Sequence, residues 1–218
     1  VAEEYLAGVK KELGKQDEST ARATATQLVE IWNDSELSEK TRDDVPGYLL
    51  KIAGSKDEMA AVAGIEGLQA VGGDDAAKGL MKVLGKALKA KEPSVPVYSA
   101  CLKALGAIAS EDSKVIKDLV KLTKHKDYDV VSKAAAALAG YKDRPGKIRK
   151  ELLEECIKQS EGVYNAAQGN DPTAKRKWNI IQSGIMSALN ALSGQSFENP
   201  AAARAWYNDN KKDRDLWK

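Results

Sequence analysis

A pair made of a small residue and a leucine recurs along this chain, with apolar or small residues at fixed helical distances around it. The pair occurs at Gly67-Leu68, Ala104-Leu105, Ala137-Leu138 and Ala188-Leu189. Further apolar or small residues stand eight before, four before and three after each leucine: Ala60, Val97, Val130, Ile181; Gly64, Cys101, Ala134, Ile185; Val71, Ile108, Tyr141, Leu192. On a helix these positions share one face, which must be buried. The recurrence predicts a stack of helical hairpins, an architecture that usually presents a binding surface.

The composition suits close packing of helix against helix. Hydrophobic residues make up 43% of the 218 residues, but aromatic residues only 6%, and Phe occurs once. A core built from Ala, Leu, Val and Ile favours helical packing over a sheet sandwich. Other periodic apolar stretches, at 80–88, 115–122 and 148–157, separate the leucine-centred segments. Outer and inner helices therefore alternate along the chain.

The chain is predicted to form a single repeat domain over residues 1–218. Its parts are divergent N-terminal repeats at 1–54, regular repeats at 55–160, an insertion at 161–178, and the last repeat with a cap at 179–218. The insertion is indicated by the long interval between the last two leucines. Asn199-Pro200 predicts the start of a final helix that covers the exposed end of the stack.

Residues 127–139, Asp-Tyr-Asp-Val-Val-Ser-Lys-Ala-Ala-Ala-Ala-Leu-Ala, resemble the second helix of a HEAT-like repeat, and Val97, Ala100 and Ala104-Leu105-Gly106 fit the same scheme. The resemblance covers about residues 40–195. It implies an all-α, right-handed α-α superhelix, or solenoid, of about five HEAT-like hairpins with a C-terminal capping helix.

Two features refine this resemblance. Val131 and Tyr98 stand where the family usually has an arginine, so the family's Asp–Arg ladder is missing. The end of the chain, Gly194-Gln195-Ser196-Phe197 and a helix with Trp206, is similar to the ends of some exported bacterial HEAT-like proteins.

The helix face opposite the buried one is small and nearly neutral. It consists of Val62, Glu66, Gln69, Ser99, Lys103, Gly106, Ser132, Ala136, Ala139, Ser183, Ser187 and Asn190. Only Glu66 and Lys103 are charged. Two interpretations remain open: small residues let neighbouring helices approach closely, or a groove accepts a partner segment through apolar and hydroxyl contacts.

The outer helices carry lysine stripes instead. The stripes are Lys78, Lys82, Lys86, Lys89 and Lys114, Lys117, Lys121, Lys124. Such stripes either keep the protein soluble or attract an anionic partner. No aromatic residue interleaves with them, which argues against stacking of a single nucleic-acid strand.

The insertion combines aromatic and cationic residues: Tyr164, Lys175, Arg176, Lys177 and Trp178. Trp178 is either an exposed partner anchor or a core residue that folds back onto the previous repeat. Asp171 or Thr173 is expected to cap the long helix that follows.

Catalytic chemistry finds little support in the sequence. The sole histidine, His125, is expected to complement the terminal carbonyls of an outer helix. Cys101 and Cys156 fall on apolar helical faces and are expected to be small buried thiols. We therefore expect no catalytic residue, no cofactor and no metal.

These observations predict a non-enzymatic scaffold or adaptor that binds another protein through its repeat surface and the insertion. The candidate partner-binding residues are Tyr98, Ser99, Lys103, Ser132, Tyr164, Lys175, Arg176, Lys177 and Trp178. The alternative is a nucleic-acid-binding protein of the HEAT-like DNA glycosylase type, which is disfavoured because the predicted concave helix face has a single lysine against a single glutamate. A HEAT-like lyase subunit that attaches a pigment is a third interpretation.

The compartment is only weakly indicated. No apolar run is long enough to cross a membrane. The chain begins at Val1 and not at Met, which favours removal of a signal peptide and thus an exported or periplasmic protein. Removal of a propeptide or a chosen chain end are the alternative explanations of Val1, and a cytoplasmic location is the alternative compartment.

Overall fold

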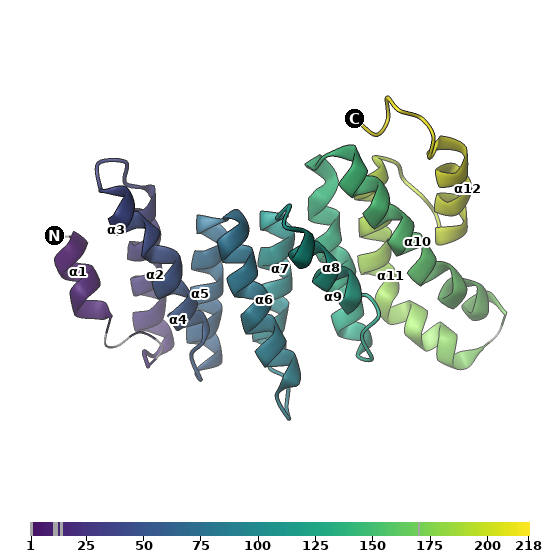
Figure 1. Ribbon diagram of the computed structural model, residues 1–218. Coiled ribbons are helices and arrows are strands. Elements are labelled where there is room, and N and C mark those ends of the chain that lie inside the picture. The colour runs from purple at the N-terminus through teal and green to yellow at the C-terminus, as the bar shows by residue number, and fades with distance from the viewer. Residues whose placement is uncertain (1, 11–12, 14, 170) are drawn as a thin grey trace. The chain divides into compact units, whose positions relative to one another are not determined.

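A computed structural model describes residues 2–10, 13, 15–169 and 171–218; Val1 lies outside this part (Figure 1). All regular secondary structure in the described residues is helical. In chain order the helices are α1 (Ala2–Val9), α2 (Glu18–Asn33), α3 (Glu39–Asp43), α4 (Val45–Ala53), α5 (Glu58–Val71), α6 (Gly73–Lys89), α7 (Val95–Ile108), α8 (Ser113–Leu122), α9 (Tyr128–Leu138), the 3-10 helix η1 (Ala139–Asp143), α10 (Gly146–Gln168), α11 (Pro172–Ser193) and α12 (Pro200–Asn210). The predicted all-α class and the sequential pairing of helices are confirmed. The handedness of the superhelix stays a prediction.

Side chains just outside the helices set where most of them begin. Aspartate carboxylates accept N–H groups of the first turn in α2, α5, α8, α9 and α11; these residues are Asp17, Asp57, Asp112, Asp127 and Asp171. Each such cap satisfies a donor that has no partner within the helix. Asp171 therefore caps α11, as predicted. Asn199 caps α12 in the same way, which confirms the predicted start of the final helix.

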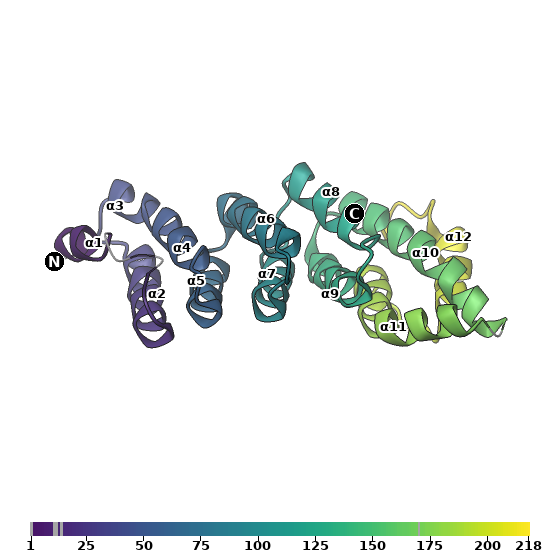
Figure 2. The same cartoon turned by 90° about the horizontal axis from the view of Figure 1, so that it is seen from below.

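The chain divides into two compact units, residues 1–110 and 111–218. In the first unit α2, α5 and α7 form one layer, and α4 and α6 lie in the other (Figure 2). Gly64 of α5 lies so close to α4 that an added Cβ would be 2.3 Å from the backbone nitrogen of Ala53. The small residues of the repeat pattern thus let the two helices of a hairpin touch.

In the second unit α11 packs between α9 and α10, and α12 packs on α10. Tyr207 of α12 donates a hydrogen bond to Glu154 of α10 at 2.9 Å, and Arg204 pairs with Glu161 at 3.1 Å. After α12 the indole of Trp217 lies near the guanidinium of Arg149 at the start of α10.

The repeat pattern identifies the buried face correctly in both units. Every residue of the pattern is buried except Val71, which is half-buried. Most of the expected insertion, residues 161–178, is helical: residues up to Gln168 form the last turns of α10, and residues from Pro172 form the first turns of α11. These two helices have 23 and 22 residues, so the extra sequence lengthens the last hairpin. None of the described helices is long and apolar enough to span a bilayer.

Candidate functional site

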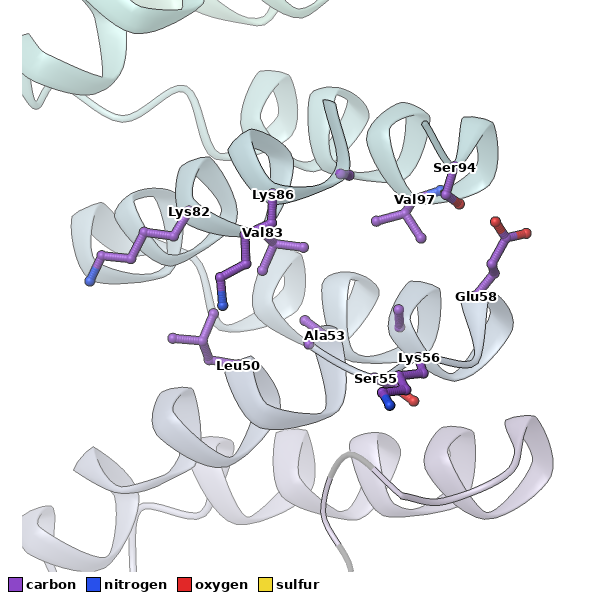
Figure 3. Close-up of a pocket in the computed structure, with 13 residues that line it drawn as sticks. Leu50, Ala53, Ser55, Lys56, Glu58, Lys82, Val83, Lys86, Ser94 and Val97 are labelled. Carbon is purple, nitrogen blue, oxygen red and sulfur yellow. The ribbon is translucent and has the colours of Figure 1, made fainter. Parts of the chain in front are cut away.

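The first unit contains a groove of about 460 Å³ between α4 and α6. One end of the groove is closed by the first turns of α5 and α7 (Figure 3). Its lining is mainly aliphatic, and it consists of Leu50, Ala53, Gly54, Ser55, Lys56, Glu58, Ala61, Lys82, Val83, Lys86, Ala87, Ser94 and Val97. A volume in the range of roughly 300–1,000 Å³ is typical of ligand pockets.

Unequal helix lengths produce this groove. The Leu50 side chain of α4 packs on Gly79 of α6, where an added Cβ would be 3.2 Å from the Leu50 Cδ1 atom. Helix α4 has only nine residues and ends at Ala53, whereas α6 has 17 residues and continues to Lys89. The second half of α6 therefore has no helix of the same layer beside it on the α4 side, and Val83 and Ala87 line open space.

Positive charge borders the groove. Lys56, Lys82 and Lys86 are exposed, and none of them forms an ion pair with a residue that the structure describes. Lys82 and Lys86 belong to the first predicted lysine stripe. Figure 3 shows Lys86 extending from α6 toward the Leu50 side of the opening, with Glu58 at the other end beside Ser94. The stripe was visible in the sequence, but the groove beneath it was not, because it depends on where α4 ends.

The end of the last hairpin holds the predicted aromatic and cationic cluster. Trp178 is only 9% exposed, and its ring meets Tyr164 edge-on with the ring centroids 5.3 Å apart. The interpretation of Trp178 as an exposed anchor is therefore wrong, and the alternative core position is the observed one. Lys177 is half-buried with its ammonium 5.2 Å from the ring centroid of Tyr128, a cation–π arrangement.

The solvent side of α11 is long and poor in charge. Lys175 and Arg176 are exposed at its beginning, and Ile180 follows one turn after Arg176 with 40% exposure. Ser183 and Ser187 continue the same face and are exposed as well. The sequence reading missed Ile180. Its only signal was a large apolar residue one position before the buried Ile181.

The candidates on α7 and α9 are less accessible than expected. Tyr98 is buried, and the Ser99 hydroxyl is buried without a hydrogen-bond partner among the described residues. An added Cβ on Gly184 of α11 would be 1.9 Å from the backbone oxygen of Ser132. At Ser132 the small residues therefore allow α9 and α11 to pack closely, and they leave no groove between these two helices. Lys103 alone of these candidates is fully exposed.

The corresponding face of the first unit is close to neutral. Arg22 of α2 forms an ion pair of 2.9 Å with Glu66 of α5, across a shallow hollow of about 280 Å³. Such an exposed pair contributes little stability, about 0–1 kcal/mol. Its main effect here is to offset the charge of Glu66.

The backbone N–H of His125 donates to the carbonyl of Leu122, the last residue of α8, at 3.1 Å, so His125 satisfies a terminal carbonyl of that helix through its backbone, whereas its imidazole serves the next helix. Its Nδ1 atom accepts the backbone N–H of Asp127 at 3.1 Å, just before α9. Together with Lys124 and Lys177 the imidazole lines a cavity of about 180 Å³, where Lys124 is already paired with Glu155 at 3.5 Å. We therefore assign the histidine to the connection between α8 and α9.

The two thiols lie in the core. Cys101 and Cys156 are unpaired and buried, and burial raises the pKa of each to about 12. A thiol that holds its proton so firmly is a poor nucleophile. No group of three His, Cys, Asp or Glu side chains within the described residues is arranged to hold a metal ion.

These features define an all-helical, repeat-like protein with two kinds of exposed surface, a cationic groove and a neutral helix face. No protein-family model matches the sequence, and no curated protein matches it. Among solved structures, an engineered protein from the Northeast Structural Genomics Consortium is similar at 21% identity, with a TM-score of 0.44, over 94% of this chain and 89% of the other.

Proposed function

We propose that the chain is a non-enzymatic scaffold or adaptor of the HEAT-like repeat type. It binds another protein through its repeat surface and through the end of the last hairpin. This end comprises residues 161–178 and the next helical turn of α11. The observation that carries this proposal is the exposed face of α11, where Arg176 and Ile180 lie one turn apart on a helix whose Trp178 is buried against Tyr164 of α10.

A partner can cover this face of α11 at a low cost in desolvation free energy. Burying an unpaired charge is expensive, whereas hydroxyl groups and an aliphatic side chain lose little on desolvation. Ile180, Ser183 and Ser187 carry no charge, and Arg176 is a residue type that is enriched among binding hot spots. A rigid helix also loses little conformational freedom when a partner covers it.

On the face formed by α2 and α5, the charges give the nucleic-acid alternative little support. A HEAT-like DNA glycosylase would need a basic binding face with aromatic residues and a catalytic carboxylate. In the first unit the exposed Arg22 is paired with Glu66 on this face. Exposed cations that are already paired have little to gain from a phosphate backbone.

The test compares partner capture by the full chain and by surface variants, in an extract of cells that make the protein. Deleting residues 161–178 would remove the buried Trp178 and disturb the fold, so point substitutions are preferable. We expect Arg176→Glu combined with Ile180→Asp to reduce recovery of the partner about tenfold or more, which corresponds to about 1.4 kcal/mol.

The control is Lys142→Glu, which reverses one positive charge as Arg176→Glu does, at an exposed position in η1. It should leave recovery unchanged, and all variants should have the same circular dichroism and melting curve. A partner recovered equally with both variants would refute the face of α11 as its site. If the unmodified chain captures no protein above background, the scaffold proposal itself fails.

A further inference from the structure

We infer that the groove between α4 and α6 binds an acidic segment of a partner protein, with aliphatic side chains on the groove floor and carboxylates against the lysines. This inference rests on the proposed scaffold function and names the chemistry of the partner. The groove lies in the first unit, so it is a second contact site in addition to the face of α11.

The floor of the groove is apolar. Leu50, Val83, Ala87 and Val97 line it together with further alanines, and none of the lining residues is aromatic. An aliphatic side chain placed there would replace water on apolar surface at about 25 cal/mol per Å². A flat nucleic-acid base would find no ring on which to stack.

Positive charge lies along the α6 side of the groove. Lys82 and Lys86 are four residues apart on α6, about 6 Å along its axis. Neither has an ion pair with a described residue, whereas Lys78 on the same helix pairs with Asp75. Alternate residues of an extended chain are about 6.6–6.8 Å apart, so two carboxylates in such a segment can face the two lysines. Glu58 repels acidic residues from the opposite end, which gives the segment one orientation.

The experiment is an NMR titration of the isotopically labelled full chain with a synthetic peptide in which leucines alternate with aspartates. We expect saturable shifts of the amide signals of Ser55, Val83 and Val97, and no such shifts with a peptide in which lysines replace the aspartates. Each exposed ion pair contributes up to about 1 kcal/mol. Because the Lys82→Glu and Lys86→Glu double variant loses two such pairs with the peptide, we expect it to bind about tenfold more weakly.

The matched control is the Lys114→Glu and Lys117→Glu double variant, the same two charge reversals on exposed residues of α8 that do not line the groove. It should bind the peptide as the unmodified chain does. Equal affinity of the aspartate and lysine peptides, or shifts confined to α11, would overturn the inference. So would tighter binding of sodium laurate in the same groove, which would indicate a lipid site instead.

Partner capture separates this inference from the proposed function. We expect the Lys82→Glu and Lys86→Glu variant to recover less partner from the extract than the Lys114→Glu and Lys117→Glu variant does. Full recovery with the groove variant and loss with the Arg176→Glu and Ile180→Asp variant would refute the groove while leaving the scaffold function intact.

Discussion

At the scale of single residues, glycines decide how closely the helices of this protein approach. Gly184 of α11 lies against Ser132 of α9, and Gly64 of α5 lies against Ala53 of α4. In both places a Cβ atom would collide with backbone, which cannot move aside as a flexible side chain can. The repeat pattern thus specifies small residues for a geometric reason.

Gly184→Ala is expected to destabilise the second unit by about 3 kcal/mol or more, because overpacking against backbone forces α9 and α11 apart. The added Cβ would be 1.9 Å from the Ser132 oxygen. Urea unfolding followed by circular dichroism measures the change. Gly162→Ala in α10 is the control: nothing lies within 4 Å of its Cβ position, so it should gain about 0.5–1 kcal/mol. Equal stability of both variants would contradict the close approach.

The Tyr207–Glu154 hydrogen bond gives a second prediction at this scale. Hydrogen bonds from Lys158 and then from Tyr207 lower the pKa of Glu154, and burial raises the pKa of Tyr207 to about 12. Tyr207→Phe should cost about 1 kcal/mol at pH 7, since it removes a hydrogen bond to a charged group. Urea unfolding at several pH values measures this cost.

The cost of Tyr207→Phe should depend on pH in both directions. A carboxylate with a lowered pKa stabilises the fold above its unfolded pKa and ceases to do so as the pH falls through the lower folded value. A phenol with a raised pKa stabilises the fold below about pH 10, and this contribution is lost as the pH rises toward about 12. The difference between variant and unmodified chain should therefore be largest near neutrality. A constant difference from pH 3 to 10 would contradict the assignment.

At the scale of helices, spacing alone predicts most of the fold. The leucine pattern identifies α5, α7, α9 and α11 and their buried faces, because the register of a helix is fixed by a few residues. Asn199 and Asp171 likewise identify helix starts, since caps are local signals.

The candidate sites were harder to predict because they depend on contacts between distant residues. The groove exists because α4 ends at Ala53 while α6 continues, and no pattern within either helix states their relative length. The sequence left Trp178 either an anchor or a core residue, because three cations precede it and no local pattern shows that Tyr164 of the neighbouring helix packs against it. The exposed Ile180 was overlooked because the buried-face pattern says nothing about apolar residues outside it.

The last hairpin, α10 with α11, offers a prediction that separates core from binding surface. Trp178→Ala should destabilise the second unit by about 3–5 kcal/mol, as expected for a large buried side chain. Ile180→Ala on the exposed side should change stability by less than about 0.5 kcal/mol. Urea unfolding compares the stability of the two variants. In partner capture below the melting temperature of the Trp178 variant, Ile180→Ala should reduce recovery more than Trp178→Ala does. A small stability loss for Trp178→Ala would contradict its burial and support the interpretation of Trp178 as an exposed anchor.

At the scale of the whole molecule, each compact unit has its own core. Fully buried leucines lie in both, for example Leu68 and Leu105 in the first and Leu138 in the second. In repeat proteins the contacts are local, so stability is divided among neighbouring hairpins instead of being shared by one core. The chain contains a natural probe of this division, because Cys101 lies in the first unit and Cys156 in the second.

Alkylation of these thiols should therefore report the opening of each unit separately. With both thiols buried and their pKa raised to about 12, the folded chain offers few thiolates at pH 8, so labelling requires opening. Gly184→Ala, at a cost of about 3 kcal/mol, should speed the labelling of Cys156 about a hundredfold. Labelling of Cys101 should change less than about threefold, because Gly184 lies in the other unit. Mass spectrometry of the two cysteine peptides measures both rates in one sample. Parallel acceleration of both would mean that the chain opens as a single cooperative unit.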